Sequence, residues 1–122
     1  MLKLVTLTRI SPEKGIDRML EMERLLPFPF EWDLYSNLNT DYAKKRVKEF
    51  KKIKFKGFCE KPLDIIKNYS YLVQVSDMEG YSYSLIEALQ CQVPVIITNF
   101  KVASEVVEDG KNGYIIPMDL NY

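Results

Sequence analysis

Short segments rich in β-branched and aliphatic residues alternate with segments of helical pattern along this whole sequence. The strand-like segments are Leu2 to Thr8, Trp32 to Tyr35, Ile53 to Lys56, Tyr71 to Val75, Pro94 to Thr98 and Tyr114 to Ile116. Helical patterns begin at Pro12, in the basic segment, at Pro62, at Leu85 and at Val102. Such alternation predicts right-handed crossovers and a mostly parallel sheet with helices on both faces. We therefore expect the α/β class, with a Rossmann-like three-layer α/β/α architecture.

The size of the chain predicts one domain. It has 122 residues, of which 47% are hydrophobic, and this is enough for one core. No internal repeat or linker divides it, so we expect residues 1–122 to form one unit. Histidine is absent and the only cysteines, Cys59 and Cys91, form no C-x-x-C pair. Zinc sites built from Cys and His and histidine-dependent triads are therefore excluded within this chain, and we expect a reducing, cytoplasmic compartment.

The net charge is zero, but the two signs are segregated along the chain. Residues 1–56 carry 13 basic and 8 acidic side chains, whereas residues 57–122 carry 4 and 9. The basic excess lies largely in one run, Lys44, Lys45, Arg46, Lys48, Lys51, Lys52, Lys54 and Lys56. Such a run is either a solvated helix face or a surface attracted to anionic lipid, which predicts peripheral contact with the inner face of a membrane. No nucleic-acid partner is expected, and no apolar run approaches the 18 residues of a membrane span.

In a parallel α/β sheet, the loops that follow the strands carry the chemistry. The first such loop holds Arg9 and Lys14, which can converge on one anion such as a pyrophosphate without a metal. The alternative is that both are ordinary exposed residues. A second loop runs from Asp77 through Glu79 into a helix with Glu87. Asp77-x-Glu79 resembles a pair of metal-holding acids, but two cations already placed for a diphosphate make a metal redundant, and we expect none.

Glu87 has two interpretations. It lies among apolar residues, so a carboxylate there needs hydrogen-bond donors, and ribose hydroxyls are suitable donors. However, Ser84-x-x-Glu87 is also a capping box, in which the carboxylate reaches back to a backbone amide. For Glu79, the alternatives are a solvated loop carboxylate and an acceptor for sugar hydroxyls, held beside exposed amides at Gly80, Tyr81 and Ser82.

Four motifs in this order resemble family 4 glycosyltransferases over nearly the whole chain. They are Arg9-Ile-Ser-Pro-Glu-Lys14-Gly15, Glu79-Gly-Tyr-Ser-Tyr-Ser-Leu-Ile-Glu87-Ala-Leu, Pro94-Val-Ile-Ile-Thr98, and Glu105-Val-Val-Glu-Asp-Gly110-Lys-Asn-Gly113-Tyr. The resemblance is to the C-terminal, donor-binding half of a two-Rossmann-domain (GT-B) enzyme. It implies retaining transfer from a nucleoside diphosphate sugar, with a UDP-sugar favoured, in surface polysaccharide or glycan assembly, and it implies no further cofactor.

The resemblance also assigns roles to residues. Arg9 and Lys14 would bind the diphosphate, Glu87 the ribose and Glu79 the transferred sugar, while amides near Ser84 and Leu85 would receive phosphate oxygens. Fixed positive charge would stabilise the leaving group. The family's N-terminal acceptor domain is absent from this sequence, so we expect the 122 residues alone not to transfer sugar.

One departure and one rival interpretation accompany the resemblance. The glycine-rich turn that commonly follows this family's second donor-domain strand is replaced by Tyr35-Ser36-Asn37-Leu38-Asn39, which contains no glycine. The rival is a non-catalytic doubly wound module, either a regulatory nucleotide-binding domain or a signalling receiver. A receiver requires acids after its first strand, where this sequence has Thr8 and Arg9.

Overall fold

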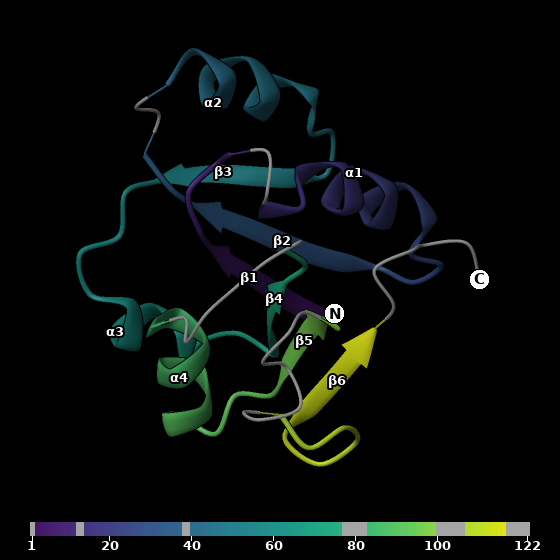
Figure 1. The fold of residues 1–122 in the computed structure, drawn as a ribbon, viewed down its shortest axis with the longest axis vertical. Coiled ribbons are helices and arrows are strands. Elements are labelled where there is room, and N and C mark those ends of the chain that lie inside the picture. The colour runs from purple at the N-terminus through teal and green to yellow at the C-terminus, as the bar shows by residue number, and fades with distance from the viewer. Residues whose placement is uncertain (1, 12–13, 38–39, 77–82, 100–106, 117–122) are drawn as a thin grey trace.

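The computed structural model describes residues 2–11, 14–37, 40–76, 83–99 and 107–116, with the backbone only for residues 83–85. Its six strands form one sheet in the order β3-β2-β1-β4-β5-β6, and every strand pair is parallel (Figure 1). The strands are β1 Leu2–Leu7, β2 Phe30–Tyr35, β3 Ile53–Gly57, β4 Tyr71–Gln74, β5 Val95–Thr98 and β6 Gly113–Ile116. This is the strand order of a Rossmann fold, in which the direction of winding reverses between β1 and β4. The predicted class and architecture are confirmed.

Helices cover both faces of the sheet. They are α1 Ile16–Leu25, α2 Asp41–Arg46, the 3-10 turn η2 Val47–Glu49, α3 Pro62–Ile66 and α4 Tyr83–Gln90. On one face α1 and α2 enclose a core with Trp32 and Val73, and on the other α3 and α4 enclose a core with Val5 and Leu72. Trp32 and Leu72 have no exposed surface. None of the described helices is long and apolar enough to span a bilayer.

A short polar chain crosses the first of these cores. The Trp32 Nε1 donates to Thr6 Oγ1 at 3.0 Å, and Thr6 Oγ1 donates to the Val73 carbonyl at 2.7 Å. All three groups are buried, so each link satisfies a group that water cannot reach. These two hydrogen bonds link β2, β1 and β4 beneath α1.

The first helix begins at Ile16 and not at Pro12, which itself lies outside the described residues. The cause is Gly15, whose φ of 79° is left-handed and ends any helical run on its N-terminal side. Gly15 also packs tightly against the end of β4, because a Cβ at this position would lie 1.8 Å from the Val75 carbonyl oxygen. Glycine is therefore required here for both its backbone angle and its size.

The basic segment forms two pieces, α2 and η2, rather than one helix. Thr40 caps α2, its Oγ1 accepting from the Ala43 amide at 3.0 Å. The connection into β3 is held by the buried Glu23 of α1, whose carboxylate accepts from the amides of Lys51, Lys52 and Ile53 at 2.8–3.2 Å. Ile53 belongs to the core, and Val47 and Phe50 pack against it.

The second half of the chain shows smaller departures from prediction. The last strand, β6, is confirmed and pairs in parallel with β5. The helix expected from Val102 to Glu108 falls mostly outside the described residues, and Val107 and Glu108 are not helical. In this connection the Asn112 side chain accepts from the Glu108 amide at 2.8 Å, and Asp109 accepts from Ile115 at 2.9 Å. These bonds shape the turn that leads into β6.

Candidate functional site

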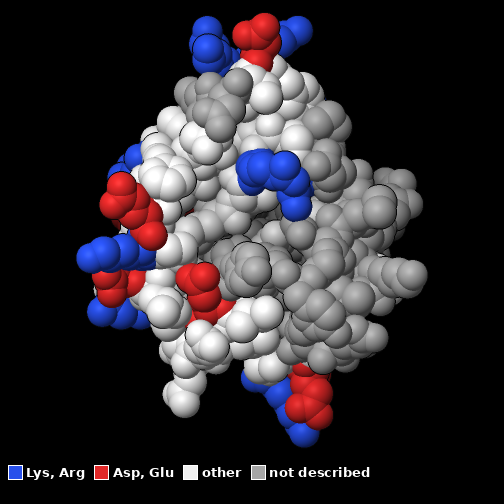
Figure 2. Space-filling view, turned by 60° about the vertical axis from the view of Figure 1, so that its left-hand side comes forward, with Lys and Arg blue, Asp and Glu red and all other residues white. Residues whose placement is uncertain are grey.

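A hollow of about 260 Å³ lies where β1, β2 and β3 end. In Figure 1 these strands point to the left, and Figure 2 shows the molecule from that side, with its surface hollowed there. The lining residues are Leu7, Thr8, Arg9, Tyr35, Ser36, Asn37, Phe58, Cys59, Pro62 and Glu87. The site is thus at the carboxyl edge of the sheet, where a doubly wound fold binds its ligands.

Two of the four charged residues predicted for the site meet in this hollow. Arg9 is exposed on the loop after β1, and Glu87 comes from α4 on the far side of the hollow. The Glu87 Oε2 is buried and has no hydrogen-bond partner among the described residues. A buried carboxylate oxygen without a donor is costly, so Glu87 offers an acceptor to a hydroxyl group that enters the hollow.

The described residues give the capping-box interpretation of Glu87 no support. The helix α4 begins at Tyr83, so Ser84 lies inside its first turn and is not the residue that caps it. A capping box would also pair the Glu87 carboxylate with a backbone amide, whereas Oε2 has no partner among the described residues. The backbone of Ser84 and Leu85 does lie in the first turn of α4, where the amide N–H groups have no carbonyl partner within the helix.

The remaining predicted residues are placed as follows. Lys14 lies on the same β1–α1 connection as Arg9 and is half-buried, but it is not among the residues that line the hollow. Glu79, Gly80, Tyr81 and Ser82, like Asp77, fall outside the described residues. Within the described part of the chain, no group of three or more acidic or cysteine side chains could hold a metal ion.

Sequence reasoning missed the wall of the hollow formed after β2 and β3. Ser36 donates its amide to the Gly57 carbonyl at 2.8 Å, and Thr8 donates to the Tyr35 carbonyl at 3.3 Å, so the three strand ends are locked together. Phe58 follows β3 and exposes 67% of its surface. The rule that loops after parallel strands carry the chemistry could have identified this wall, since Ser36 and Phe58 each directly follow a strand end.

Two neighbouring groups shape the wall further. Tyr69 donates to Asp33 Oδ2 at 2.6 Å and lies 3.5 Å from the Tyr35 hydroxyl, so it supports Tyr35 from behind. Burial and the contact with Asp33 raise the pKa of Tyr69 far above its usual range, and the phenol stays protonated. Burial likewise raises the pKa of the Cys59 thiol, and the negative charge of Glu87 adds to the rise.

The end of β4 is held by groups from α1 and β5. Arg18 of α1 donates to the Val75 carbonyl at 3.1 Å, and Thr98 of β5 donates to the Ser76 carbonyl. Gly15 allows the close approach of α1 to the same point. The chain therefore leaves β4 in a fixed direction at Ser76, where residues 77–82 continue.

The hollow suits a ligand with three different parts. Arg9 is a fixed cation that can bind an anionic group, and Glu87 can accept hydrogen bonds from hydroxyls. The exposed ring of Phe58 offers a flat apolar surface in the lining of the same hollow. Such a combination of charge, hydroxyl acceptor and aromatic face is typical of a site for a phosphorylated nucleoside.

The family model described as "Glycosyl transferases group 1" matches residues 2–121. Among curated relatives, a poly(ribitol-phosphate) alpha-N-acetylglucosaminyltransferase of Staphylococcus aureus is 27% identical over 118 residues, which are 90% of this chain and 24% of that protein. The GtfA subunit of a UDP-N-acetylglucosamine–peptide N-acetylglucosaminyltransferase of Streptococcus pneumoniae is 29% identical over 125 residues, which are 93% of this chain and 24% of that protein. The chain thus spans about a quarter of the length of these relatives.

Solved structures give the same fold. The Anabaena protein HepE, in complex with UDP and glucose, superposes with a TM-score of 0.83 at 23% identity, over 97% of this chain and 35% of that chain. The pneumococcal O-GlcNAc transferase GtfA, in complex with UDP and GlcNAc, superposes with a TM-score of 0.73 at 26% identity, over 99% of this chain and 25% of that chain. The described sheet therefore corresponds to one Rossmann-like part of larger transferases, as expected for half of a GT-B fold.

Proposed function

Since the chain belongs to the family described as glycosyl transferases group 1, we propose that it is the donor-binding domain of a retaining, family 4 enzyme of the GT-B type. Its donor is a nucleoside diphosphate sugar, with a UDP-sugar favoured. The relatives act in glycan and polysaccharide assembly, among them a capsular polysaccharide biosynthesis glycosyltransferase of Staphylococcus aureus. We propose that the acceptor of this protein belongs to a surface polysaccharide or another glycan.

The observation that carries the proposal is the buried, unpartnered oxygen of Glu87, a residue that lines the same hollow as Arg9. A ribose hydroxyl supplies the hydrogen bond that Oε2 lacks, and the diphosphate supplies the negative charge that Arg9 attracts. In this arrangement the base lies against the wall made by Phe58 and Ser36. The glycine-free turn at Tyr35-Ser36-Asn37 therefore contributes to the donor site rather than weakening it.

Catalysis in this proposal depends on stabilising the leaving group. As the glycosidic bond breaks, negative charge develops on the departing diphosphate, and Arg9 and Lys14 are the side chains that stabilise it. Amides in the first turn of α4, at Ser84 and Leu85, receive phosphate oxygens, since the N-terminus of a helix attracts anions. Glu79, beside the amides of Gly80, Tyr81 and Ser82, orients the transferred sugar.

Two cations and helix amides together neutralise a diphosphate, so the proposed site requires no divalent metal. The acceptor side is supplied by a second Rossmann-like domain, and only the two domains together transfer sugar. A catalytically inactive nucleotide-sugar-binding domain is distinguished by adding that domain and measuring transfer.

The proposal is tested by calorimetric titration of the chain with UDP-glucose in excess chelator. We expect weak binding without magnesium. Replacing Arg9 with alanine removes a charged hydrogen-bond donor worth about 1.5–3 kcal/mol, which corresponds to a loss of affinity of about tenfold to a hundredfold. The matched control is Arg24→Ala, because Arg24 is exposed on α1 and pairs only locally with Glu21 among the described residues. Binding that requires a divalent ion, or that survives replacement of both Arg9 and Lys14, contradicts the proposed diphosphate site.

Glu87→Ala provides a second and independent test. If Glu87 holds ribose, the substitution lowers donor affinity and leaves stability unchanged or raised, because a buried oxygen without a donor is removed. A capping role predicts the reverse, with a loss of stability of about 1 kcal/mol and little change in affinity. Thermal unfolding monitored by circular dichroism, combined with the same titration, separates the two roles.

A further inference from the structure

The segment of residues 41–56 concentrates positive charge on one part of the molecule. It carries eight basic and two acidic side chains, a net charge of +6. Seven of the basic residues are exposed lysines, and none of them forms an ion pair within the described part of the chain. We call five of them, on α2, η2 and the connection to β3, the basic surface: Lys44, Lys45, Lys48, Lys51 and Lys52. Lys54 and Lys56 alternate along β3 with Ile53 of the α1–α2 core, so they lie on the other face of the sheet.

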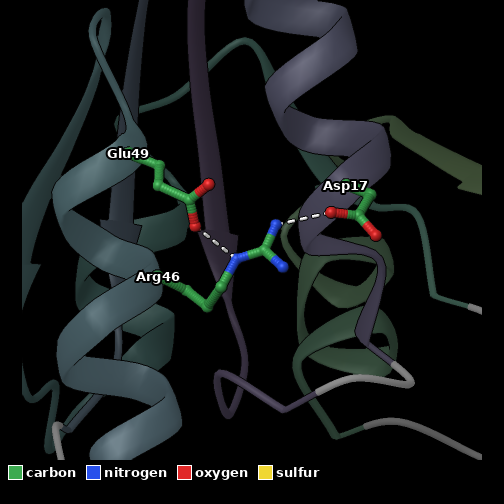
Figure 3. Close-up of polar contacts among 3 residues, drawn as sticks. All are labelled: Asp17, Arg46 and Glu49. Atoms are coloured by element: carbon green, nitrogen blue, oxygen red, sulfur yellow. Dashed lines mark hydrogen bonds and ion pairs between the residues drawn. The ribbon is translucent and has the colours of Figure 1, made fainter.

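The one arginine of the segment has a different role. Arg46 points between α1 and the end of η2, where it is paired with Asp17 on one side and with Glu49 on the other, the latter at 2.6 Å (Figure 3). Its side chain is only 19% exposed. Arg46 thus links α1 to the helix that displays the lysines and is paired with two carboxylates. The lysines of the basic surface form no ion pair among the described residues.

The basic surface lies away from the donor hollow. The sheet ends at the edge strand β3, which α2 precedes in the chain, and Figure 2 shows basic side chains projecting at the top, where Figure 1 places α2. Lys51 and Lys52 precede β3, so they lie at the amino end of a strand whose carboxyl end borders the hollow. A partner that contacts these two lysines therefore binds at the opposite end of β3 from the hollow.

Exposed apolar side chains adjoin the lysines at this amino end of the sheet. Leu25 and Phe28, on the connection from α1 to β2, are 52% and 41% exposed. The Lys52 Nζ lies 5.7 Å from the ring centre of Phe30, which begins β2, and this contact joins the basic surface to the apolar side chains. Lysines at the same end of a sheet as exposed aromatic and aliphatic groups are typical of surfaces that lie at the boundary between lipid headgroups and acyl chains.

We propose that the basic surface docks this protein on an anionic lipid bilayer. The choice of lysine carries the argument: specific recognition of one phosphate favours the planar, bidentate arginine, whereas lysines act as hydrated point charges toward many diffuse anions. A bilayer presents such anions over an area wide enough to face α2, η2 and the connection to β3 at once. Leu25 and Phe28 then enter the headgroup region. The inference goes beyond the proposed function and does not depend on it, because docking involves no donor or acceptor.

The test is co-sedimentation of the 122-residue chain with vesicles of 30% phosphatidylglycerol and 70% phosphatidylcholine. We expect binding that weakens as salt rises, since surface charges are screened. Replacing Lys44, Lys45 and Lys48 with glutamine weakens binding by about a hundredfold, taking about fivefold for each lysine near the lipid surface. The control replaces Lys3, Lys61 and Lys67, which are exposed outside the segment and carry the same total charge. The control leaves binding within about threefold of the original chain, and circular dichroism verifies that both variants are folded.

Three results overturn the proposal. One is the absence of vesicle binding at low salt, and another is an equal loss in the two triple variants, which means that net charge alone is responsible. The third concerns a soluble polyanion as the partner. If heparin binds the chain as tightly as the vesicles do and Phe28→Ser weakens neither, the surface recognises a charged polymer and not a bilayer. Docking on lipid predicts that Phe28→Ser weakens vesicle binding alone.

Discussion

Substituting alanine for Gly15 tests how strongly the β1–α1 connection, which carries Arg9 and Lys14, depends on the packing of α1. Gly15 has a φ of 79°, and a Cβ there would lie 1.8 Å from the Val75 carbonyl oxygen and 2.7 Å from its carbon. The backbone angle alone costs an alanine about 1–2 kcal/mol. The overlap adds about 1–3 kcal/mol, because α1 or the end of β4 must move away. We therefore expect Gly15→Ala to destabilise the protein by about 3 kcal/mol.

The control is Gly110→Ala, since Gly110 has a φ of 85° but nothing within 4 Å of its added Cβ. That variant incurs the cost of the angle only, about 1 kcal/mol. For a chain of this size, 1 kcal/mol shifts the melting temperature by about 4 °C, so thermal unfolding should fall by about 12 °C for Gly15→Ala and about 4 °C for Gly110→Ala. Only Gly15→Ala should also weaken donor binding. Equal destabilisation of the two variants would refute the reasoning, because the overlap with Val75 would then have no energetic consequence.

Three further changes test the framework around the site. Glu23→Ala removes the acceptor of three amides, of which that of Ile53 is buried, and should cost about 3 kcal/mol in urea unfolding. The same change at exposed Glu21 should cost less than about 0.5 kcal/mol. Thr6→Val removes the hydroxyl that links Trp32 to β4 and should cost about 1–3 kcal/mol, more than the same change at the half-exposed Thr8. The raised pKa of Cys59 lowers its thiolate fraction at pH 8, so iodoacetamide should modify Cys59 slowly at that pH and faster as the pH rises. UDP-glucose should slow the reaction at Cys59, which lines the hollow, but not at Cys91. Protection of both cysteines, or of neither, would count against the position of the hollow.

The fold was predictable because its signals are local. Alternating strand and helix segments are visible in the sequence, and the parallel order then follows from the handedness of crossovers. The start of the first helix was misplaced because the helix-opening tendency of Pro12 was given more weight than Gly15, whose left-handed angle ends the helical run. The split of the basic segment into α2 and η2 depends on tertiary contacts such as Glu23 with the amides of Lys51 to Ile53, which no local pattern shows.

The site was predictable in part. Arg9 and Glu87 share the hollow as expected, because both follow the carboxyl ends of strands, and that edge of the sheet is fixed by the topology. The cap expected at Ser84 depends on the helix boundary, because a shift of two residues decides whether Ser84 lies at the start of α4 or inside it. The wall formed by Ser36 and Phe58 was missed because its residue types are chemically ordinary and acquire meaning only from their position.

The most direct test of the donor site is a titration of the ¹⁵N-labelled chain with UDP-glucose in excess chelator, observed through amide chemical shifts. The account predicts that the shifts cluster at Arg9, Ser36, Phe58 and Glu87. A second hollow, lined by Leu89, Gln92, Val93, Pro94, Lys111 and Asn112, lies at the opposite edge of the sheet and serves as an internal control. Shifts confined to that second hollow, or no shifts at millimolar donor, would contradict the assignment of the donor to the carboxyl edge.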